Sequence, residues 1–372
     1  MAEDKSGLFL VAIVAIVAVF GIIMMSGFVA NENTVGEAFR TSLKTAAPKQ
    51  ETAQPSKYLT AWWQKPTSNP PEETDPFNFD GRLVWFNPAV HSADFHDLFY
   101  QGENWAIARE DVDIFQFARS VLANQVSDEE LSNAVTKLNE WEITIALGGE
   151  AVKHWDCTGV NAANAARVQI ERIRAAGGNV VYYTMDEPLY SGLSDTACNF
   201  DATEGSTEAG MIKTAQVVKT VVDMLWAWYP DIKIGVVEVW PGPGYAYGPE
   251  VHKQWFDLLY AATGGRLDHY HIDHGFVNIQ NPDYNELIDM QSYITSKGVR
   301  FGVIYNYLLA TNDYEFYQGT KSYMNLLKPL LGTTHDAFFA SWEPVPMYNL
   351  PDSSGYSFTN LIKDAAAGEF VD

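Results

Sequence analysis

The chain has 372 residues, more than a typical domain, but α/β barrels of this length occur as single units. Its 47 acidic and 24 basic residues give a formal net charge of −23. Binding to a phosphate backbone requires clustered Lys and Arg, so this charge argues against nucleic acid as a partner. The hydrophobic fraction of 47% allows a large core, and the aromatic fraction of 13% is high.

The first feature along the chain is an apolar run without charges at residues 7–25. A helix of about nineteen residues would be roughly 28 Å long, close to the thickness of the hydrocarbon core. A cleaved signal peptide usually has a shorter apolar core and a small-residue exit, and residues 26–30 form only a weak cleavage site. We therefore expect residues 1–30 to be an uncleaved transmembrane signal-anchor that uses the lipid bilayer as a partner.

The flanking charges are similar on both sides of this run and do not decide its orientation. We expect the rest of the chain to lie in the periplasm or the extracellular space. Residues 31–76 are rich in Thr, Ala, Gln, Lys and Pro and lack periodicity, so they predict an extended linker. The folded domain then covers residues 77–372.

Short apolar runs alternate with helical stretches from Arg82 onward, a pattern typical of βα units around a parallel sheet. Ser127 predicts a helix N-cap before three acidic residues, and residues 161–175 and 211–228 also show helical spacing. We predict a single (β/α)8 TIM barrel, since no Gly-rich loop of a doubly wound sheet follows the first run. The eight predicted strands are Leu83–Asn87, Asp113–Ala118, Glu142–Leu147, Asn179–Met185, Ile232–Val239, Leu267–Asp273, Arg300–Asn306 and Asp336–Trp342.

Acids, amides and aromatic residues stand at the ends of these runs, where barrels of this kind place their active sites. A single acid there is more often a helix cap, but acids from several strands favour a common site. Glycoside hydrolysis needs this mixture, because one carboxylic acid protonates the leaving oxygen and a second carboxylate attacks or activates water. The candidate catalytic residues are Asp186, Glu187, Glu238, Asp273 and Glu343. The candidate substrate-binding residues are Trp85, Asn87, Gln116, Arg119, Glu150, Trp240, His271, His274, Tyr305, Asn306 and Trp342.

The motif M-D-E-P-L at residues 185–189 resembles the strand-four N-E-P motif of the large superfamily of retaining barrel glycosidases. Residues 113–361 also resemble a group of largely uncharacterised bacterial barrel proteins classed with the glycosidases. Their recurring motifs match Asp156-Cys157, Met185–Leu189, Gly302–Asn306 and Ser341–Pro344 here. The resemblance implies a TIM barrel that acts on a glycan, with Glu187 as acid/base and Asp186 in the place of the usual Asn.

The sequence departs from that superfamily at the seventh strand, where Tyr305 and Asn306 stand in place of the nucleophilic Glu. Either another strand supplies the second carboxylate, or the site is not a hydrolase. Among the candidates we rank Glu238 first, because the fifth strand neighbours the fourth, and Asp273 next.

The cluster of His271, Asp273 and His274 raises the question of a zinc site. His271 and Asp273 share a strand face but His274 does not, and another strand would have to supply a further ligand. We therefore expect no metal and no cofactor. Cys157 and Cys198 follow the third and fourth strands, and outside the cytoplasm we expect them to form a disulfide.

Two hypotheses follow. The first is a membrane-anchored, extracytoplasmic glycoside-hydrolase-like barrel that acts on or binds a polysaccharide or glycan. The alternative is a non-catalytic barrel, either an accessory or structural subunit of a larger membrane complex or a carbohydrate-binding module. The missing carboxylate of the seventh strand, the acidic charge and the retained apolar helix motivate the alternative.

Overall fold

The structure is a computed structural model that describes residues 82–89, 91–153, 155–194, 198–240, 248–273, 284–332, 335–353 and 355–367. The predicted anchor, the predicted linker and His274 lie outside these ranges. None of the described helices has the length and apolar character needed to cross a membrane.

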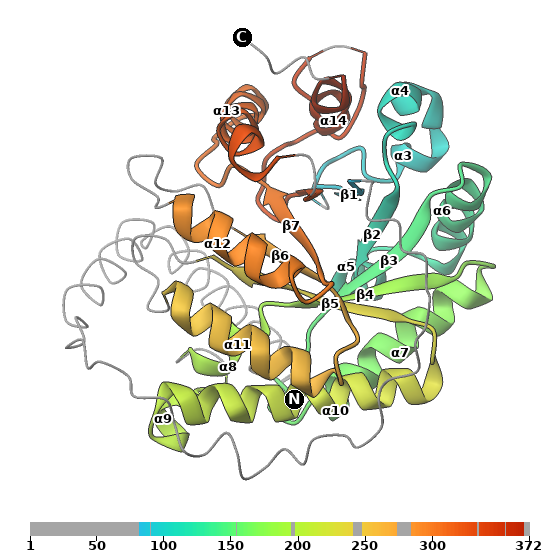
Figure 1. The fold of residues 1–372 in the computed structure, drawn as a ribbon. Helices are drawn as coiled ribbons and strands as arrows, with labels where there is room; N and C mark the ends of the chain where they lie inside the picture. The colour runs from blue at the N-terminus through green and yellow to red at the C-terminus, as the bar shows by residue number, and fades with distance from the viewer. Residues whose placement is uncertain are drawn as a thin grey trace, which may run out of the picture. The chain divides into compact units, whose positions relative to one another are not determined.

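Eight parallel strands close into one barrel in sequence order, so the predicted (β/α)8 fold is confirmed (Figure 1). The barrel closes where β1 pairs with β8, with Val84 opposite Ala337 and Asn87 opposite Ala340. The strands are β1 Val84–Asn87, β2 Ile114–Ala118, β3 Thr144–Gly149, β4 Val180–Asp186, β5 Lys233–Val239, β6 Leu267–Asp273, β7 Arg300–Tyr305 and β8 Asp336–Ala340.

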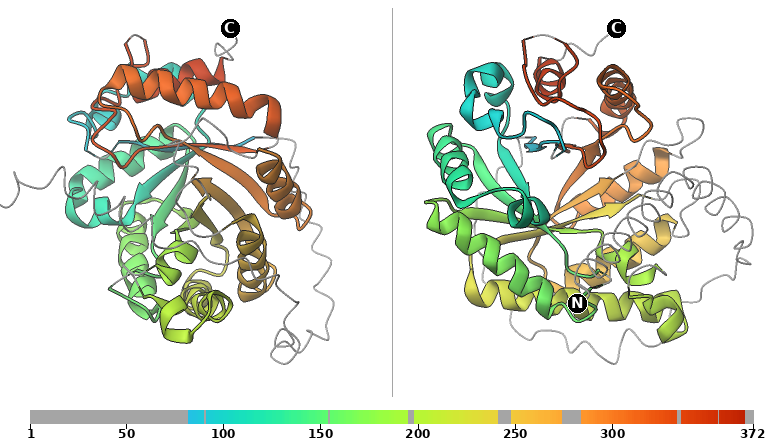
Figure 2. Two further views of the ribbon diagram at one scale, coloured as in Figure 1. Left: turned by 90° about the vertical axis from the view of Figure 1, so that its left-hand side faces the viewer. Right: turned by 180° about the vertical axis from the view of Figure 1, so that it is seen from behind.

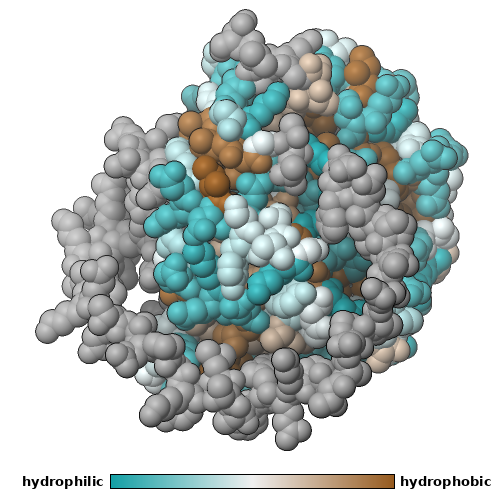
Figure 3. Space-filling model, viewed as in Figure 1, coloured by the Kyte–Doolittle hydropathy of each residue, from teal (hydrophilic) through white to brown (hydrophobic). Residues whose placement is uncertain are grey.

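Helices follow the strands and surround the barrel, as the views from the side and from behind also show (Figure 2). In the orientation of Figure 1 the described surface is largely polar, with apolar residues in smaller groups (Figure 3). The helices are α3 Asp97–Tyr100, η1 Gly102–Trp105, α4 Ala106–Arg109, α5 Arg119–Asn124, α6 Asp128–Glu140, α7 Val160–Ala175, α8 Pro188–Leu193, α9 Phe200–Glu204, α10 Thr207–Trp228, α11 Pro249–Ala262, α12 Tyr284–Thr295, α13 Asp313–Leu331 and α14 Phe358–Ala366.

The observed strand bounds differ from the predicted ones by up to two residues. The largest differences are at β3 and β8. The third strand begins at Thr144 rather than Glu142, because Glu142 has a φ of 59° that is incompatible with a strand. It continues to Gly149, two residues beyond the predicted end, because Gly148 and Gly149 do not extend the apolar run. The eighth strand ends at Ala340, two residues before Trp342.

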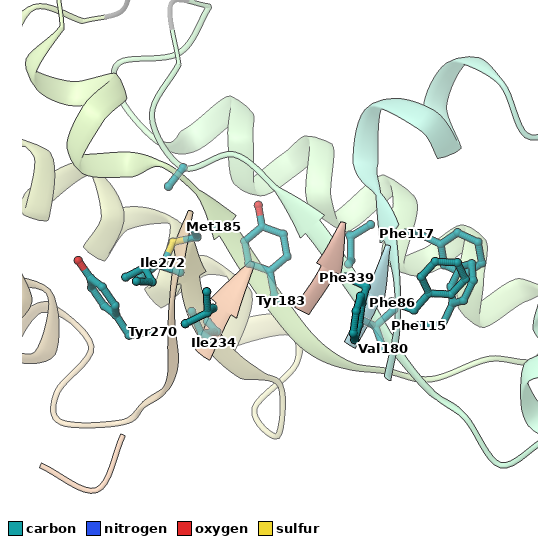
Figure 4. Close-up of a cluster of buried hydrophobic side chains, with 14 of the residues drawn as sticks. Phe86, Phe115, Phe117, Val180, Tyr183, Met185, Ile234, Tyr270, Ile272 and Phe339 are labelled. Atoms are coloured by element: carbon teal, nitrogen blue, oxygen red, sulfur yellow. The ribbon is translucent and has the colours of Figure 1, made fainter. Parts of the chain in front are cut away.

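Side chains on the strands alternate between the barrel interior and the layer between barrel and helices. Figure 4 shows outward-facing side chains of this layer, with Phe86, Phe115 and Phe117 gathered on one side. The Phe115 ring lies 5.8 Å from Phe86 and 4.9 Å from Phe117, in edge-to-face contacts that aromatic rings favour. This alternation decides which residues of each strand can reach the mouth of the barrel.

A buried polar layer fills the barrel interior around Asp336. Its carboxylate accepts a hydrogen bond from Trp85 Nε1 at 3.3 Å, lies 3.3 Å from His271 Nε2, and pairs with Arg300. Gly302 leaves room for the His271 ring, which a Cβ at that position would approach to 2.4 Å. The structure therefore places Trp85 and His271 in the packed barrel interior, whereas the sequence suggested that both bind substrate.

Candidate functional site

A cavity of about 340 Å³ opens among the carboxyl ends of the strands. Acidic, basic, amide and aromatic side chains line it together with small residues of the strand ends. The lining residues are Asn87, Gln116, Ala118, Arg119, Ser120, Gly148, Gly149, Glu150, Thr184, Asp186, Glu187, Val237, Asp273, Ile304, Phe338, Ala340 and Trp342. Eight of these were candidates from the sequence: Asn87, Gln116, Arg119, Glu150, Asp186, Glu187, Asp273 and Trp342.

Glu187 stands directly after β4, at the turn into α8. Its backbone is left-handed, with φ 47° and ψ 49°, and its N–H donates to the carbonyl of Val237 at 2.8 Å. Pro188 follows at the first position of the helix. A proline fits there because the backbone N–H that it lacks would have no partner within the helix. The tight turn between strand and helix therefore brings the carboxyl of Glu187 into the cavity, with 22% of the side chain exposed.

The surroundings of Glu187 favour the protonated form of its carboxyl. Burial and the negative charge of Asp186 raise its pKa to about 8, and the charge of Asp273 acts in the same direction. The ammonium of Lys153 lowers the pKa but does not cancel these effects. At neutral pH the group is largely protonated, which is the state that a general acid requires.

Lys153 is a charged residue of this site that the sequence analysis did not single out. Its ammonium lies 3.0 Å from Asp186 and 3.9 Å from Glu187. Burial lowers the pKa of Lys153, but the two neighbouring carboxylates offset this and leave it above its ordinary value. No pattern in the sequence marks the residue, because it lies in a loop three positions after Glu150.

Asp273 ends β6 and lines the cavity with only 5% of the residue exposed. Its backbone carbonyl accepts a hydrogen bond from Trp240 N at 2.7 Å, which joins the ends of β5 and β6. The carboxyl of Asp273 is close enough to raise the pKa of Glu187. The mouth of the barrel thus holds carboxyl groups of two strands, β4 and β6, that influence each other's charge.

Arg119 and Glu150 form a second charged pair in the lining. The guanidinium donates two hydrogen bonds to the carboxylate, at 2.6 and 2.9 Å, and its carbon lies 5.3 Å from the centre of the Trp155 ring. Such a forked pair is geometrically specific and fixes both side chains. Arg119 and Trp155 therefore offer a cationic group and a partly exposed aromatic ring beside the cavity.

Gln116 and Trp342 supply the polar and aromatic contacts of the lining. Gln116 is 5% exposed, and its Oε1 has no hydrogen-bond partner among the described residues. Gly148 leaves room for this amide, since a Cβ there would come within 2.6 Å of Gln116 Nε2. A buried amide oxygen without a partner is costly, so it is suited to accept a hydrogen bond from a ligand hydroxyl. Trp342 is 42% exposed, and its ring can cover a ligand.

Glu238, ranked first as the second carboxylate, lies on the other face of β5. Val237 lines the cavity, and the next side chain along the strand therefore points outward. Glu238 is fully buried and accepts hydrogen bonds from Leu189 N at 3.0 Å and from Trp255 Nε1 at 2.7 Å. Burial raises its pKa well above the ordinary value. Instead of lining the cavity, Glu238 holds the start of α8, directly behind Glu187.

The remaining candidates do not line the cavity. Trp240 is buried with its ring 5.3 Å from that of His252, and Tyr305 is buried with its hydroxyl 2.8 Å from His335 Nε2. Asn306 is also buried, and Glu343 lies on the partly exposed loop after β8. Among the residues that the structure describes, His, Cys, Asp and Glu form no group of three that could hold a metal ion.

The predicted disulfide between Cys157 and Cys198 is confirmed. It joins the loop between β3 and α7 to the segment between α8 and α9, with a sequence separation of 41 residues. Both segments belong to the carboxyl-end side of the barrel that carries the cavity. The cross-link therefore ties together two loops beside Glu187.

The fold and the lining define a class: a (β/α)8 barrel whose mouth carries carboxyl groups, an amide and aromatic rings. No protein-family model matches the sequence, and none of the curated proteins matches it.

The solved structures that are similar include a family 1 β-glucosidase from Thermotoga maritima, at 11% identity over 71% of this chain and 88% of that chain, with a TM-score of 0.44. Fungal β-1,4-galactanases match at 10% identity over 71% and 90%, with a TM-score of 0.47. A psychrophilic family 10 endo-β-1,4-xylanase matches at 11% identity over 77% and 97%, with a TM-score of 0.45. This likeness concerns the barrel fold alone.

Proposed function

We propose that the chain is a glycoside-hydrolase-like protein that binds a glycan at the barrel mouth and cleaves a glycosidic bond. The observation that carries this proposal is the carboxyl of Glu187, which lines the cavity with a pKa raised to about 8. A protonated carboxyl at neutral pH can donate its proton to the glycosidic oxygen as the C–O bond breaks.

Asp273 is the second carboxylate in this proposal. It comes from a different strand than Glu187, lines the same cavity, and interacts with the charge of Glu187. A carboxylate in that place can stabilise or attack the developing oxocarbenium centre, or it can remove a proton from the attacking water. Water supplies the hydroxyl that the sugar gains, and the proton of Glu187 leaves with the departing group.

The other lining residues position the glycan. Oε1 of Gln116 accepts a hydrogen bond from a sugar hydroxyl, and the Arg119–Glu150 pair offers hydrogen-bond donors and acceptors at one side of the cavity. The ring of Trp342 covers an apolar face of the sugar. Asn87 adds an amide at the end of β1. The mixture of amide, ion pair and aromatic ring suits a polyhydroxylated ligand.

A panel of polysaccharides and aryl glycosides tests the proposal. We expect Glu187→Gln and Asp273→Asn each to lower kcat on a cleaved substrate at least about a hundredfold, since general acid–base groups contribute that much. Hydrolysis by the wild type should also decline above about pH 8, where Glu187 loses its proton. The matched control is Glu140→Gln on the exposed surface of α6, which should leave kcat unchanged.

Full activity of Glu187→Gln on such a substrate would contradict the assignment. Glycan binding without cleavage, in both the wild type and Glu187→Gln, would instead support the non-catalytic alternative. A specific feature favours that alternative: β7 contributes Ile304 to the lining and no acid. The anomeric form of the first product, followed by NMR, would report whether the reaction retains or inverts configuration.

We also propose that residues 7–25 anchor the protein in a membrane, with the barrel in the periplasm or extracellular space. The support is the length of the uncharged run, together with the Cys157–Cys198 disulfide, which is typical of oxidising compartments. Full-length protein should stay with the membrane after alkaline carbonate extraction, and a chain lacking residues 1–30 should not. Release of the full-length chain by carbonate would contradict anchoring.

A further inference from the structure

Lys153 lies where it can act on both acids at the end of β4. Its ammonium is 3.0 Å from the carboxylate of Asp186 and 3.9 Å from that of Glu187. The side chains of Lys153 and Glu187 are 23% and 22% exposed, so water screens their contact less than that of a surface ion pair, whereas the Asp186 side chain is 52% exposed. The arrangement brings one cation between two carboxyl groups of adjacent residues.

The backbone of Lys153 is fixed by Asp156. The two residues exchange backbone hydrogen bonds, with Lys153 N donating at 3.3 Å and Asp156 N donating at 2.8 Å. The carboxylate of Asp156 in turn accepts hydrogen bonds from Thr158 N at 2.9 Å and Ala162 N at 2.8 Å. Through Asp156, the loop that carries Lys153 is attached to the first turn of α7.

The disulfide attaches the same loop to the segment after Glu187. Cys157 directly follows Asp156, and Cys198 Sγ lies 3.6 Å from the carbonyl oxygen of Lys153. Cys198 N donates to the carbonyl of Ser191 in α8 at 3.3 Å, and α8 begins at the residue after Glu187. The cross-link therefore joins the support of Lys153 to the support of Glu187.

We propose that Lys153 is a positioning residue of the candidate site, and that the Cys157–Cys198 disulfide holds its ammonium against Asp186 and Glu187. The inference rests on the proposed role of Glu187 as an acid and deepens it. The cation fixes the orientation of Asp186 beside Glu187 and limits how strongly the neighbouring negative charges favour the protonated acid.

The charged groups that act on Glu187 come from several elements. Asp186 is its neighbour on β4, Asp273 lies at the end of β6, and Glu238 is buried behind it on β5. Lys153 opposes these acids, because its charge favours the ionised form of Glu187. Loss of the ammonium should therefore move the titration midpoint of Glu187 upward.

Carbon-13 NMR of the Glu side-chain carboxyls measures this midpoint directly, with the Glu187 signal assigned by its loss in Glu187→Gln. Lys153→Met should raise the midpoint by about one pH unit or more, the effect expected of an opposite charge at this distance. Lys153→Arg keeps the charge and should restore most of the wild-type value. The matched control is Lys137→Met, which removes an exposed ion pair on α6 and should not change the midpoint.

The disulfide is tested in the same way with Cys157→Ala/Cys198→Ala, which should raise the midpoint in the same direction as Lys153→Met. If that variant does not fold, reduction of the folded wild type with a phosphine reductant replaces it. A titration midpoint of Glu187 that is the same in folded Lys153→Met as in the wild type would overturn the role of Lys153. If the midpoint of Glu187 is raised in Lys153→Met but is unchanged in the protein without the cross-link, the role of the disulfide is overturned.

These measurements need no substrate, so they separate the inference from the proposed function. If Glu187→Gln cleaves glycans as well as the wild type does, the proposed function fails whatever the titration shows. If cleavage depends on Glu187 but Lys153→Met does not change the titration midpoint of Glu187, the positioning role of Lys153 fails and the proposed function stands.

Discussion

Glu187 combines a partly buried carboxyl, a left-handed backbone and an acidic neighbour at one position. Burial and the charge of Asp186 disfavour the ionised carboxyl and raise its pKa to about 8, whereas the φ of 47° strains the backbone in either protonation state. A pKa that differs between the folded and unfolded states makes the stability of the folded chain depend on pH, and the sign of that effect follows from the direction of the shift.

The pKa of Glu187 is raised from about 4.5 to about 8 on folding, so the folded state binds more protons than the unfolded state in this window. Stability is therefore lost as the pH rises from about 4.5 to about 8. Glu187→Gln removes the titrating group, and we expect it to be more stable than the wild type at pH 9 by on the order of 5 kcal/mol. At pH 4.5 the two proteins should unfold with similar free energies.

Urea unfolding of both proteins at the two pH values measures the difference. Glu140→Gln, exposed on α6, is the control for the exchange itself. A stability difference between Glu187→Gln and the wild type that does not change with pH would contradict the raised pKa.

The sequence predicted Glu187, Asp186 and Asp273 as site residues because they stand at strand ends, and all three line the cavity. It ranked Glu238 too high because nearly every residue of β5 is apolar, so the pattern does not reveal which face is inward. The sequence did not predict Lys153 as a site residue, because its position depends on a loop conformation and a cross-link, which no local pattern encodes.

The elements of the barrel were largely predictable because parallel strands are short apolar runs separated by helices of regular spacing. The predicted bounds of β6 are those observed, and β3 differs most because it ends in two glycines. Helix starts were also legible where a capping residue is present. Ser127 caps α6 and exchanges hydrogen bonds with Glu130, forming a complete capping box.

Removal of this cap should destabilise the barrel locally. Ser127→Ala leaves the N–H of Glu130 without its side-chain partner, and we expect a loss of about 1 kcal/mol in the free energy of unfolding. Ser132→Ala, on the exposed side of α6, is the matched control and should change the free energy by less than about 0.5 kcal/mol. Equal effects of the two changes in urea unfolding would contradict a stabilising cap.

The barrel as a whole buries histidines that its sequence does not distinguish from surface ones. His252, His271 and His335 are each at most 2% exposed, and burial lowers the pKa of each to about 4. Their rings lie in different parts of the molecule: His252 near Tyr270, His271 in the barrel interior, and His335 near Tyr305. The fold therefore carries three imidazoles that are neutral at mildly acidic pH.

A histidine whose pKa falls from about 6.5 to about 4 on folding binds fewer protons in the folded state than in the unfolded state. Stability is then lost as the pH falls from about 6.5 to about 4, by on the order of 3 kcal/mol for each of the three groups. Unfolding in urea at pH 7, 5.5 and 4.5 measures this decline. His252→Asn should reduce the slope, while His91→Asn at an exposed position should not. A flat profile over this range would contradict three buried neutral histidines.

At Glu187 the residue that would best stabilise the fold differs from the residue that the proposed function requires. A residue with a side chain is strained at φ 47°, and glycine adopts that conformation freely. Selection for thermal resistance alone would therefore favour glycine over glutamate at this position, by roughly 1–2 kcal/mol of backbone strain. Stabilised libraries of this chain should drift toward Glu187→Gly unless a functional screen is applied in parallel. Retention of glutamate there would then mark the position as one that function, not folding, maintains.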